Sequence, residues 1–175
     1  MPPTGAPSRP TGEPGHAALL RRTLRRHAAG VTVITVPGPA GFTATSFTSV
    51  SLSPALVSFC VARASSAADA VRRADRFAVH LLGVADADLA ERFARSGGDR
   101  FAGARLELHD GLPVLCDAPA WLGARVAARH PAGDHLLVVG EVLAGGVRRH
   151  SPALVRHDGA YARPVRLRPP VPRDE

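Results

Sequence analysis

The segment from residue 120 to residue 147 constrains the fold of this chain more than any other. Two extended, largely apolar runs, Ala120–His130 and His135–Val147, flank the short stretch Pro131-Ala132-Gly133-Asp134. Pro and Gly between two such runs are typical of a tight turn, and strands joined by a tight turn pair as an antiparallel hairpin. The sequence therefore predicts one long hairpin, which commits the chain to an antiparallel sheet.

Further extended runs recur along the chain. Rich in Val, Ile, Leu and Phe, they are expected to form strands, at Val31–Val36, Ala55–Ala62, Phe77–Leu82, Arg105–His109 and Ala153–His157. With the hairpin they make about seven strands, a number that favours closure of the sheet into a barrel. The βαβ alternation of a dinucleotide-binding fold is missing, and so are the GxGxxG and GxxxxGK[ST] phosphate loops. Residues 110–113 are expected to be irregular.

Short helices are expected at three places. The first, Ala17–Ala29, has Leu20 and Leu24 on one face and is ended by Gly30. We expect it to lie on the surface against a sheet, and binding to a membrane surface is the alternative. Helices are also expected over residues 67–74 and 87–95.

Two side chains are candidates to begin the later helices. Ser66-Ala67-Ala68-Asp69 matches a capping box for the helix over residues 67–74. Asp86 is placed to cap the helix over residues 87–95, whose inward face is expected to carry Leu89, Ala90 and Phe93.

The length of 175 residues suits one domain, which we place at residues 16–163. Residues 1–15 and 164–175 are Pro-rich and aperiodic, and are expected to be disordered tails. No run of about 18 apolar residues and no signal peptide is present. We therefore expect a cytoplasmic protein without a membrane span, in which Cys60 and Cys116 are free thiols.

The net charge of +7 and the pI near 11.2 raise the possibility of nucleic-acid binding. However, all 22 basic residues are Arg, and the chain has no Lys, Asn or Gln, which indicates a bias towards GC-rich codons. The arginines are also scattered rather than gathered in one stripe. Phosphorylated small molecules are the simpler partner for this charge, so no nucleic-acid partner is expected.

The stretch Phe42–Leu52 carries six Ser and Thr side chains in eleven positions. Within it, residues 43–51 are expected to form a loop at the end of a strand, where hydroxyls and free backbone N–H groups make a cradle for phosphates and polar ring edges. The equally acceptable alternative is a strand with a polar outward face. Ser65 and Ser66, at the start of the helix over residues 67–74, add N–H groups that suit a phosphate, although simple capping explains them as well.

Other kinds of chemistry find little support. His130 and His135 flank the hairpin turn, but no third residue completes a metal-ligand spacing, so no metal site is expected. His80 lies within a predicted strand and is expected in the core or facing a second subunit. The GxSxG motif is absent, and neither Cys60 nor Cys116 has a catalytic context, which argues against a nucleophilic hydrolase.

The stretch Gly41–Pro54, GFTATSFTSVSLSP, closely resembles the signature GxTASSFxSVSLxPP of the flavin reductase family with the split-barrel fold. That family comprises the small reductase components of two-component flavin monooxygenases. Similar segments follow in the same order at Cys60–Ser66, Arg76–Leu82, Asp99–Gly103 and Gly133–His135, so the resemblance covers about residues 17–162. It implies a mainly β fold, an antiparallel Greek-key split β-barrel with a few short helices.

The sequence departs from the family pattern in four ways. TATS stands for the commoner TASS, Ala55 for the second Pro of the signature, and His80 for a usual Asn. Ser65-Ser66-Ala67-Ala68 stands where relatives often have Ser-Arg-Thr. The missing Arg and Thr weaken the expected phosphate contacts and leave the choice between FMN and FAD open.

The resemblance implies a flavin site and a place for the nicotinamide. Three groups of residues are expected near the flavin ring, the ribityl phosphate and the flavin border, and His135 is expected near the nicotinamide. The residues implied for binding are Thr43, Ala44, Thr45 and Ser46, then Cys60, Val61, Ala62, Ser65 and Ser66, and finally Arg100 and Phe101.

The implied activity is reduction of FMN or FAD by hydride transfer from NADH or NADPH, with delivery of reduced flavin to a partner monooxygenase. Cofactors supply that chemistry, so no acid–base dyad is needed in the chain. The resemblance also implies a homodimer. The alternative functions are a non-catalytic or electron-transfer split-barrel flavoprotein with tightly bound FMN, and a basic nucleic-acid-binding barrel.

Overall fold

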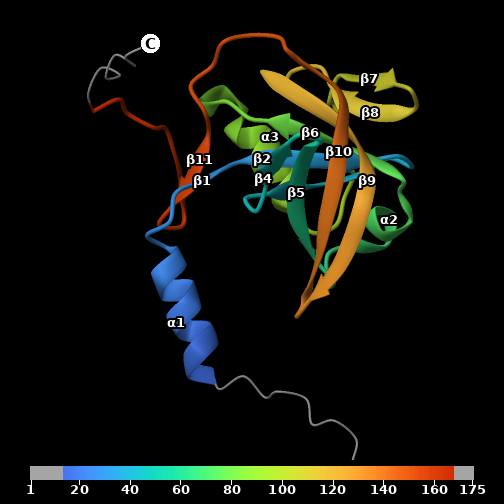
Figure 1. Ribbon diagram of the computed structural model, residues 1–175. Helices are drawn as coiled ribbons and strands as arrows, with labels where there is room; N and C mark the ends of the chain where they lie inside the picture. The colour runs from blue at the N-terminus through green and yellow to red at the C-terminus, as the bar shows by residue number, and fades with distance from the viewer. Residues whose placement is uncertain (1–13, 168–175) are drawn as a thin grey trace, which may run out of the picture.

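A seven-stranded antiparallel sheet forms the body of the protein, whose computed structural model describes residues 14–167 (Figure 1). The strand order is β3-β2-β6-β9-β10-β5-β4. The strands are β2 (Thr32–Val36), β3 (Ala40–Ala44), β4 (Thr48–Leu52), β5 (Ala55–Ala62), β6 (Arg76–Leu81), β9 (Ala120–Ala132) and β10 (His135–Val147). The mainly β, antiparallel Greek-key class is confirmed. Within residues 14–167, β3 and β4 end the order and do not pair with each other, so hydrogen bonds do not close the sheet.

The predicted hairpin is the longest element of the sheet. β9 and β10 pair from His135 opposite Ala132 to Val147 opposite Ala120, and the turn has only two residues, Gly133 and Asp134. β6 pairs with the far side of β9, and β5 with the far side of β10. The hairpin therefore joins the two halves of the sheet.

Two smaller sheets extend the body. One consists of β1 (Ala29–Gly30), β11 (Val155–His157) and β12 (Ala160–Ala162), and the other of β7 (Leu106–His109) and β8 (Leu112–Leu115). The expectation of an irregular stretch over residues 110–113 is wrong. Asp110-Gly111, both with positive φ, form a two-residue turn between β7 and β8, the pair of residues that such hairpin turns favour.

The hydroxyl-rich stretch is not one loop. Residues up to Ala44 belong to β3 and residues from Thr48 belong to β4, so only Thr45, Ser46 and Phe47 lie between strands. The prediction of a loop over residues 43–51 is therefore wrong at both ends. Thr has high strand propensity. β3, which includes Thr43, pairs with β2, and β4, which begins at Thr48, pairs with β5.

The helices are α1 (Pro14–Leu24), α2 (Ala68–Arg73) and α3 (Ala87–Ala94), with a 3₁₀ turn at Val84–Asp86. α2 and α3 confirm the predicted helices, but both predicted caps are wrong. Neither helix has a side-chain cap. The Asp86 carboxylate accepts hydrogen bonds from the backbone N–H of Gly83 (2.7 Å) and from Arg149 (2.9 Å), and the Ser66 hydroxyl accepts one from Arg100.

α1 does not lie against the sheet as expected. It is shorter than the predicted span and stands apart from the body (Figure 1). Leu19, Leu20 and Leu24 are 52%, 59% and 52% exposed, because none of the sheet faces in residues 14–167 lies under this helix. α1 therefore has the leucines that were expected to pack, but residues 14–167 provide no surface that covers them.

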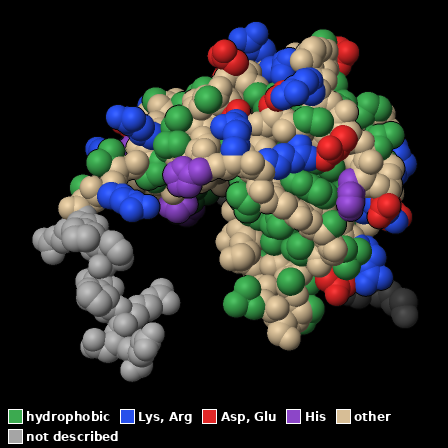
Figure 2. Space-filling view, turned by 90° about the horizontal axis from the view of Figure 1, so that it is seen from above, with side chains coloured by type: hydrophobic (Ala, Val, Ile, Leu, Met, Phe, Trp, Pro, Cys, Tyr) green, Lys and Arg blue, Asp and Glu red, His purple; other side chains and the backbone are tan. Residues whose placement is uncertain are grey.

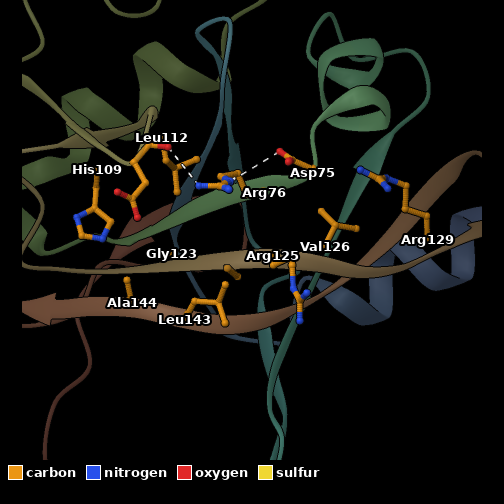
Figure 3. Close-up of a pocket in the computed structure, with 12 residues that line it drawn as sticks. Asp75, Arg76, His109, Leu112, Gly123, Arg125, Val126, Arg129, Leu143 and Ala144 are labelled. Carbon is orange, nitrogen blue, oxygen red and sulfur yellow. Dashed lines mark hydrogen bonds and ion pairs between the residues drawn. The ribbon is translucent and has the colours of Figure 1, made fainter.

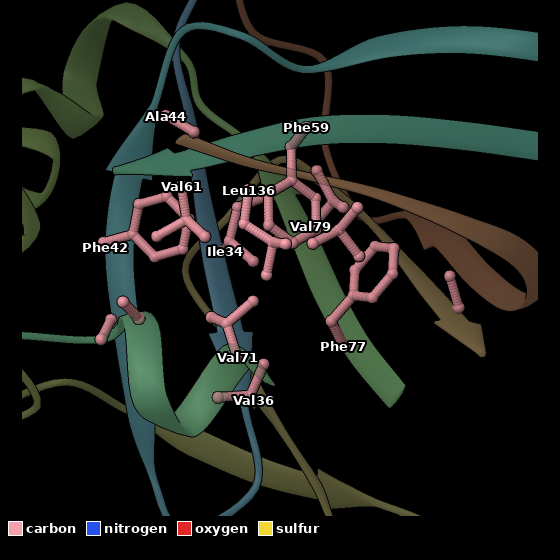
Figure 4. Packing of buried hydrophobic residues seen from close by; sticks show 14 of the residues in the cluster. Ile34, Val36, Phe42, Ala44, Phe59, Val61, Val71, Phe77, Val79 and Leu136 are labelled. Carbon is pink, nitrogen blue, oxygen red and sulfur yellow. The ribbon is translucent and has the colours of Figure 1, made fainter. Parts of the chain in front are cut away.

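The main core lies between the inner face of the sheet and α2 (Figure 4). Phe59 is at its centre, with its ring 5.9 Å from Phe42 and 4.9 Å from Phe77, the latter edge-to-face. Gly140 of β10 lies under the Phe77 ring, where a Cβ would come within 2.4 Å of it. Such close packing has no space for a larger residue at that position.

A smaller cluster lies under the β7–β8 hairpin. Trp121, the only tryptophan of the chain, packs there with Leu112, Val114 and Ala78. Its ring is 5.0 Å from that of His109, at an interplanar angle of 65°.

His80 is a fully buried polar residue that links three strands. Its Nε2 accepts a hydrogen bond from the backbone N–H of Leu115, so Nδ1 carries the proton and donates to the carbonyl of Val33, both at 3.0 Å. Burial lowers the pKa of His80 from 6.5 to about 4, the positive charge of Arg148 acts in the same direction, and the bond to Val33 opposes both. The expectation of a core histidine is confirmed.

On the face that Figure 2 shows, the basic side chains of the described residues do not gather into one stripe. Figure 2 shows arginines spread over one face with acidic side chains among them. None of the helices within residues 14–167 has the length and apolarity needed to cross a bilayer. The expected tails over residues 1–15 and 164–175 lie mostly outside the described residues, and the domain bounds of 16–163 stay a prediction.

The buried neutral state of His80 predicts an acid-sensitive fold. As pH falls from above 6.5 towards 4, the unfolded chain binds a proton that folded His80 does not, so stability is lost over that range. The loss expected by about pH 5 is about 2 kcal/mol of unfolding free energy. Urea unfolding at several pH values measures it. His80→Asn should flatten the dependence, whereas His157→Asn, at an exposed position, should leave it unchanged; equal slopes in all three proteins would contradict this assignment.

Candidate functional site

A cleft of about 370 Å³ opens where β3, β5, α3 and the β9–β10 turn meet. Ten residues expected at the site from sequence line it: Thr43, Ala44, Thr45, Ser46, Cys60, Ala62, Ser65, Ser66, Arg100 and His135. Four that sequence reasoning missed complete the lining: Phe42, Phe93, Ala94 and Ser96. Phe93 and Ala94 belong to a helix that was predicted, but its place beside β3 was not.

Strand register brings distant parts of the chain to this cleft. His135 lies opposite Ala62, and Leu137 opposite Cys60, in the β10–β5 ladder. The backbone N–H of Arg63 also donates to the carbonyl of Asp134, at 2.9 Å. The hairpin turn is therefore fixed against the end of β5, with the His135 side chain at the cleft.

Two of the hydroxyls hold the cleft wall together. The Ser46 hydroxyl accepts a hydrogen bond from the backbone N–H of Cys60 (2.9 Å) and donates to its carbonyl (3.2 Å), which extends the β4–β5 ladder beyond the start of β4. The Thr43 hydroxyl donates to the carbonyl of Ala90 at 2.6 Å and ties β3 to α3. Thr45, exposed between them, has no side-chain partner among residues 14–167 and is available to a ligand.

Arg100 lines the cleft and is held in place by three hydrogen bonds. Its Nη2 donates to the Ser66 hydroxyl (2.9 Å), its Nη1 to the carbonyl of Gly41 (2.7 Å), and its Nε to the carbonyl of Arg95 (2.9 Å). A guanidinium has five N–H groups, so two are left without a partner in the described residues. A partly buried, fixed guanidinium with free donors suits a phosphate.

An imidazole and a thiol, those of His135 and Cys60, also line the cleft. His135 Nδ1 lies 2.7 Å from an Asp134 carboxylate oxygen, and this hydrogen bond holds the pKa of the Asp134 carboxyl below its usual value. The contact leaves Nε2 of His135 for a ligand. Burial raises the pKa of the Cys60 thiol, so this cysteine is not primed as a nucleophile.

Two residues expected at the site lie elsewhere. Val61 points into the core and is 1% exposed, because alternate residues of a strand face opposite sides. Phe101 packs edge-to-face on Phe93, with ring centroids 5.0 Å apart, and lines a separate, smaller cleft. No cluster of three His, Cys, Asp or Glu side chains occurs within residues 14–167.

A larger cavity, about 480 Å³, shares no lining residue with this cleft (Figure 3). Its polar lining is largely engaged: Arg125 pairs with Glu141 at 2.7 Å, and Arg76 donates to the carbonyl of Asp110 at 3.2 Å. It contains none of the clustered hydroxyls. The cleft of about 370 Å³ is the better candidate, because side chains with free hydrogen-bonding groups from three separate segments, Thr45, Arg100 and His135, line it.

The cleft of about 370 Å³ has the chemistry of a binding site for a polar, phosphorylated ring. It offers hydroxyls, a fixed guanidinium and an imidazole, with partly apolar walls from Phe42 and Ala94. These groups fit the polar edge, ribityl chain and phosphate of a flavin nucleotide.

Residues 24–164 match the family model described as flavin reductase like domain. The chain belongs to the flavin reductase family. An NADH:FMN oxidoreductase of Rhodococcus erythropolis is 46% identical over 160 residues, which cover 86% of this chain and 83% of that protein. The reductase subunit HsaB of a flavin-dependent monooxygenase from Mycobacterium tuberculosis is 35% identical over 127 residues, 70% of this chain and 68% of that one.

A solved family structure also has this fold. The NADH:FAD oxidoreductase SgcE6 of Streptomyces globisporus C-1027, in complex with NAD and FAD fragments, superposes with a TM-score of 0.81. It is 32% identical, and the match covers 87% of this chain and 95% of that one. Family members thus include one named for FMN and one named for FAD.

The Ser46 hydroxyl is predicted to stabilise the fold as well as the cleft. Ser46→Ala should lower the free energy of unfolding by about 1 kcal/mol, because the backbone groups of Cys60 lose their partner. It should also speed amide exchange at Cys60. Ser49→Ala, an exposed serine without a side-chain hydrogen bond in the described chain, is the matched control; equal effects of both variants would refute a structural role for Ser46.

Proposed function

We propose that this protein is an NAD(P)H-dependent flavin reductase that transfers a hydride from NADH or NADPH to FMN or FAD and supplies the reduced flavin to a partner monooxygenase. The observation that carries the proposal is the convergence of ten resemblance-derived site residues on one cleft. Family membership supports it, since relatives are named as NADH:FMN and NADH:FAD oxidoreductases and as a monooxygenase reductase subunit.

The chain's own residues bind and orient. A bound flavin supplies the acceptor for the hydride, and the protein supplies position and electrostatics. We assign the free N–H groups of Arg100, with Ser65 and Ser66, to the phosphate, and Thr45 with the neighbouring backbone to the polar ring edge. His135, held through Asp134, positions the nicotinamide. Fixed donors of this kind reduce the ordering cost of binding.

We also propose that the protein is a homodimer. The resemblance implies it, and two apolar surfaces need a cover. α1 presents three half-exposed leucines, and an isolated helix of 11 residues is marginal in water. Leu52 of β4 and Val147 of β10 are 94% and 83% exposed.

Sedimentation equilibrium tests the homodimer directly. Twice the chain mass of 18.3 kDa is expected, and Leu20→Glu should shift the equilibrium towards monomer because it places a charge on the apolar face of α1. A mass of 18.3 kDa for the unaltered protein at micromolar concentration would rule the dimer out.

Two finer expectations remain proposals: the split-barrel arrangement, which the resemblance implies, and the cytoplasmic location, which was expected from the sequence because it has no apolar run of about 18 residues and no signal peptide. The alternative functions differ in observable ways. A flavoprotein with tightly bound FMN would stay yellow through purification and would not turn over NADH. A nucleic-acid-binding barrel would lose affinity steeply with salt.

The decisive experiment is a nicotinamide oxidation assay. Purified protein is mixed with NADH or NADPH and free FMN or FAD, and the loss of reduced-nicotinamide absorbance is followed. Flavin-dependent turnover at a rate well above that of the uncatalysed mixture is expected. Absence of turnover with every pair of cofactors would refute the function.

Variants then divide the site. Thr45→Ala combined with Ser46→Ala should raise the KM for flavin about tenfold or more, because it removes one free hydroxyl and the support of the bend. His135→Ala should act mainly on the KM for NADH. Ser49→Ala is the control and should match the unaltered protein. If the double variant keeps the flavin KM, the site assignment is wrong even where the activity is present.

A further inference from the structure

The cavity of about 480 Å³ has no part in the proposed flavin site (Figure 3). Its volume is within the range of ordinary ligand pockets, about 300–1,000 Å³. Gly123 of β9 alternates with Leu122 and Ala124, which belong to the main core, so it faces the other side of the sheet. There it lies opposite Ala144 of β10. These two small residues leave a depression, which Leu112 of β8 walls.

Three guanidinium groups line this cavity, those of Arg76, Arg125 and Arg129. Arg76 and Arg125 are direct partners in the β6–β9 ladder, and like charges directly opposite each other destabilise a sheet. Arg125 is paired with Glu141 at 2.7 Å, but the carboxylate of Asp75 is 3.8 Å from Arg76 and its side chain is 82% exposed. An anion bound beside the two arginines would reduce the repulsion that remains between them.

Arg129 is anchored but not fully satisfied. Its Nη2 donates to the carbonyls of Val71 and Ala74 at the C-terminal end of α2. Its Nε is buried and has no hydrogen-bond partner in the part of the chain that the structure describes, and a buried donor without an acceptor costs free energy. A guanidinium that is held in place and lacks an acceptor at Nε suits a carboxylate ligand.

The rest of the lining favours an aromatic ligand over an inorganic ion. Leu112, Leu143 and Val126 give the cavity apolar walls, which a small inorganic ion would leave uncovered. The His109 imidazole, also in the lining, is held edge-on to the Trp121 ring at 5.0 Å. Imidazole and guanidinium groups both stack on aromatic rings.

We infer that this cavity is a binding site for a small planar carboxylate, with its charge at the three arginines and its ring over Gly123 and Ala144. The inference does not depend on the proposed flavin site, because the two sites share no residue. Asp110, in the turn between β7 and β8, also lines the cavity. Its negative charge opposes an anion there, and this opposition can be tested.

Calorimetric titration with benzoate tests the site, because benzoate has both the ring and the charge. A Kd on the order of 1 mM is expected for a probe of this size. Benzyl alcohol, which lacks the charge, and acetate, which lacks the ring, should bind at least about fivefold more weakly. Saturating FMN should leave the benzoate Kd unchanged. No binding of benzoate, equal binding of either comparison compound, or displacement of benzoate by FMN would overturn the inference.

Matched variants locate the binding. Arg125→Gln should weaken benzoate binding about fivefold, because it removes one of the charges at the cavity. Arg72→Gln is the control: Arg72 is also exposed and pairs with one carboxylate, that of Asp69, at 2.6 Å, but it does not line the cavity. The Arg72→Gln protein should keep the benzoate Kd of the unaltered protein.

A gain of affinity covers the case in which Arg125→Gln does not fold. Asp110→Asn removes the opposing charge and should strengthen benzoate binding about twofold. Asn is well suited to the positive φ of this position and to the turn that it forms with Gly111. The same Kd for Arg125→Gln and Arg72→Gln, or no gain with Asp110→Asn, would place benzoate elsewhere and refute the site.

Discussion

The ladder between β10 and β5 is the interaction on which the rest of the structure depends. It carries Val138 against Phe59 in the core and His135 against Ala62 at the cleft, within the same run of paired residues. A slip of one residue would turn every side chain to the opposite face. The core would lose its central ring contacts, and His135 would leave the cleft. Folding and the proposed chemistry are thus coupled through one register.

The cleft is built from groups that serve the fold first. Thr43 and Ser46 use their hydroxyls to tie β3 to α3 and the bend to β5. Arg100 uses three of its N–H groups to join β3, the start of α2 and the end of α3. What remains for a ligand is small in number and fixed in place. Such a site needs few residues of its own, because preorganisation supplies much of its effect.

The strands of this fold were predictable because their signals are local. The hairpin over residues 120–147 and the strand Ala55–Ala62 follow from apolar runs and turn residues, and the structure has both. β8 was missed, because residues 110–113 were expected to be irregular although Asp110-Gly111 is a strong hairpin signal. The half-exposed α1 was predicted as a packed helix, because an apolar stripe does not say which surface it packs on.

The site was predictable only through the family resemblance. Ser66 and Arg100 are 34 residues apart, and no periodicity or spacing joins them. The helix-cap interpretation of Ser66 was wrong because a distant guanidinium competes for its hydroxyl. Val61 was carried over with its neighbours although strand alternation turns it inward. Sequence patterns give the elements, and the strand register and long-range side-chain contacts assemble the cleft.

The position of Trp121 has a practical consequence. The single indole of the chain is packed between the sheet and the β7–β8 hairpin, edge-on to His109, and it shares no lining residue with the cleft. Its emission therefore reports the docking of this outer hairpin. The protein therefore carries its own fluorescent probe for a part of the molecule that does not line the proposed site.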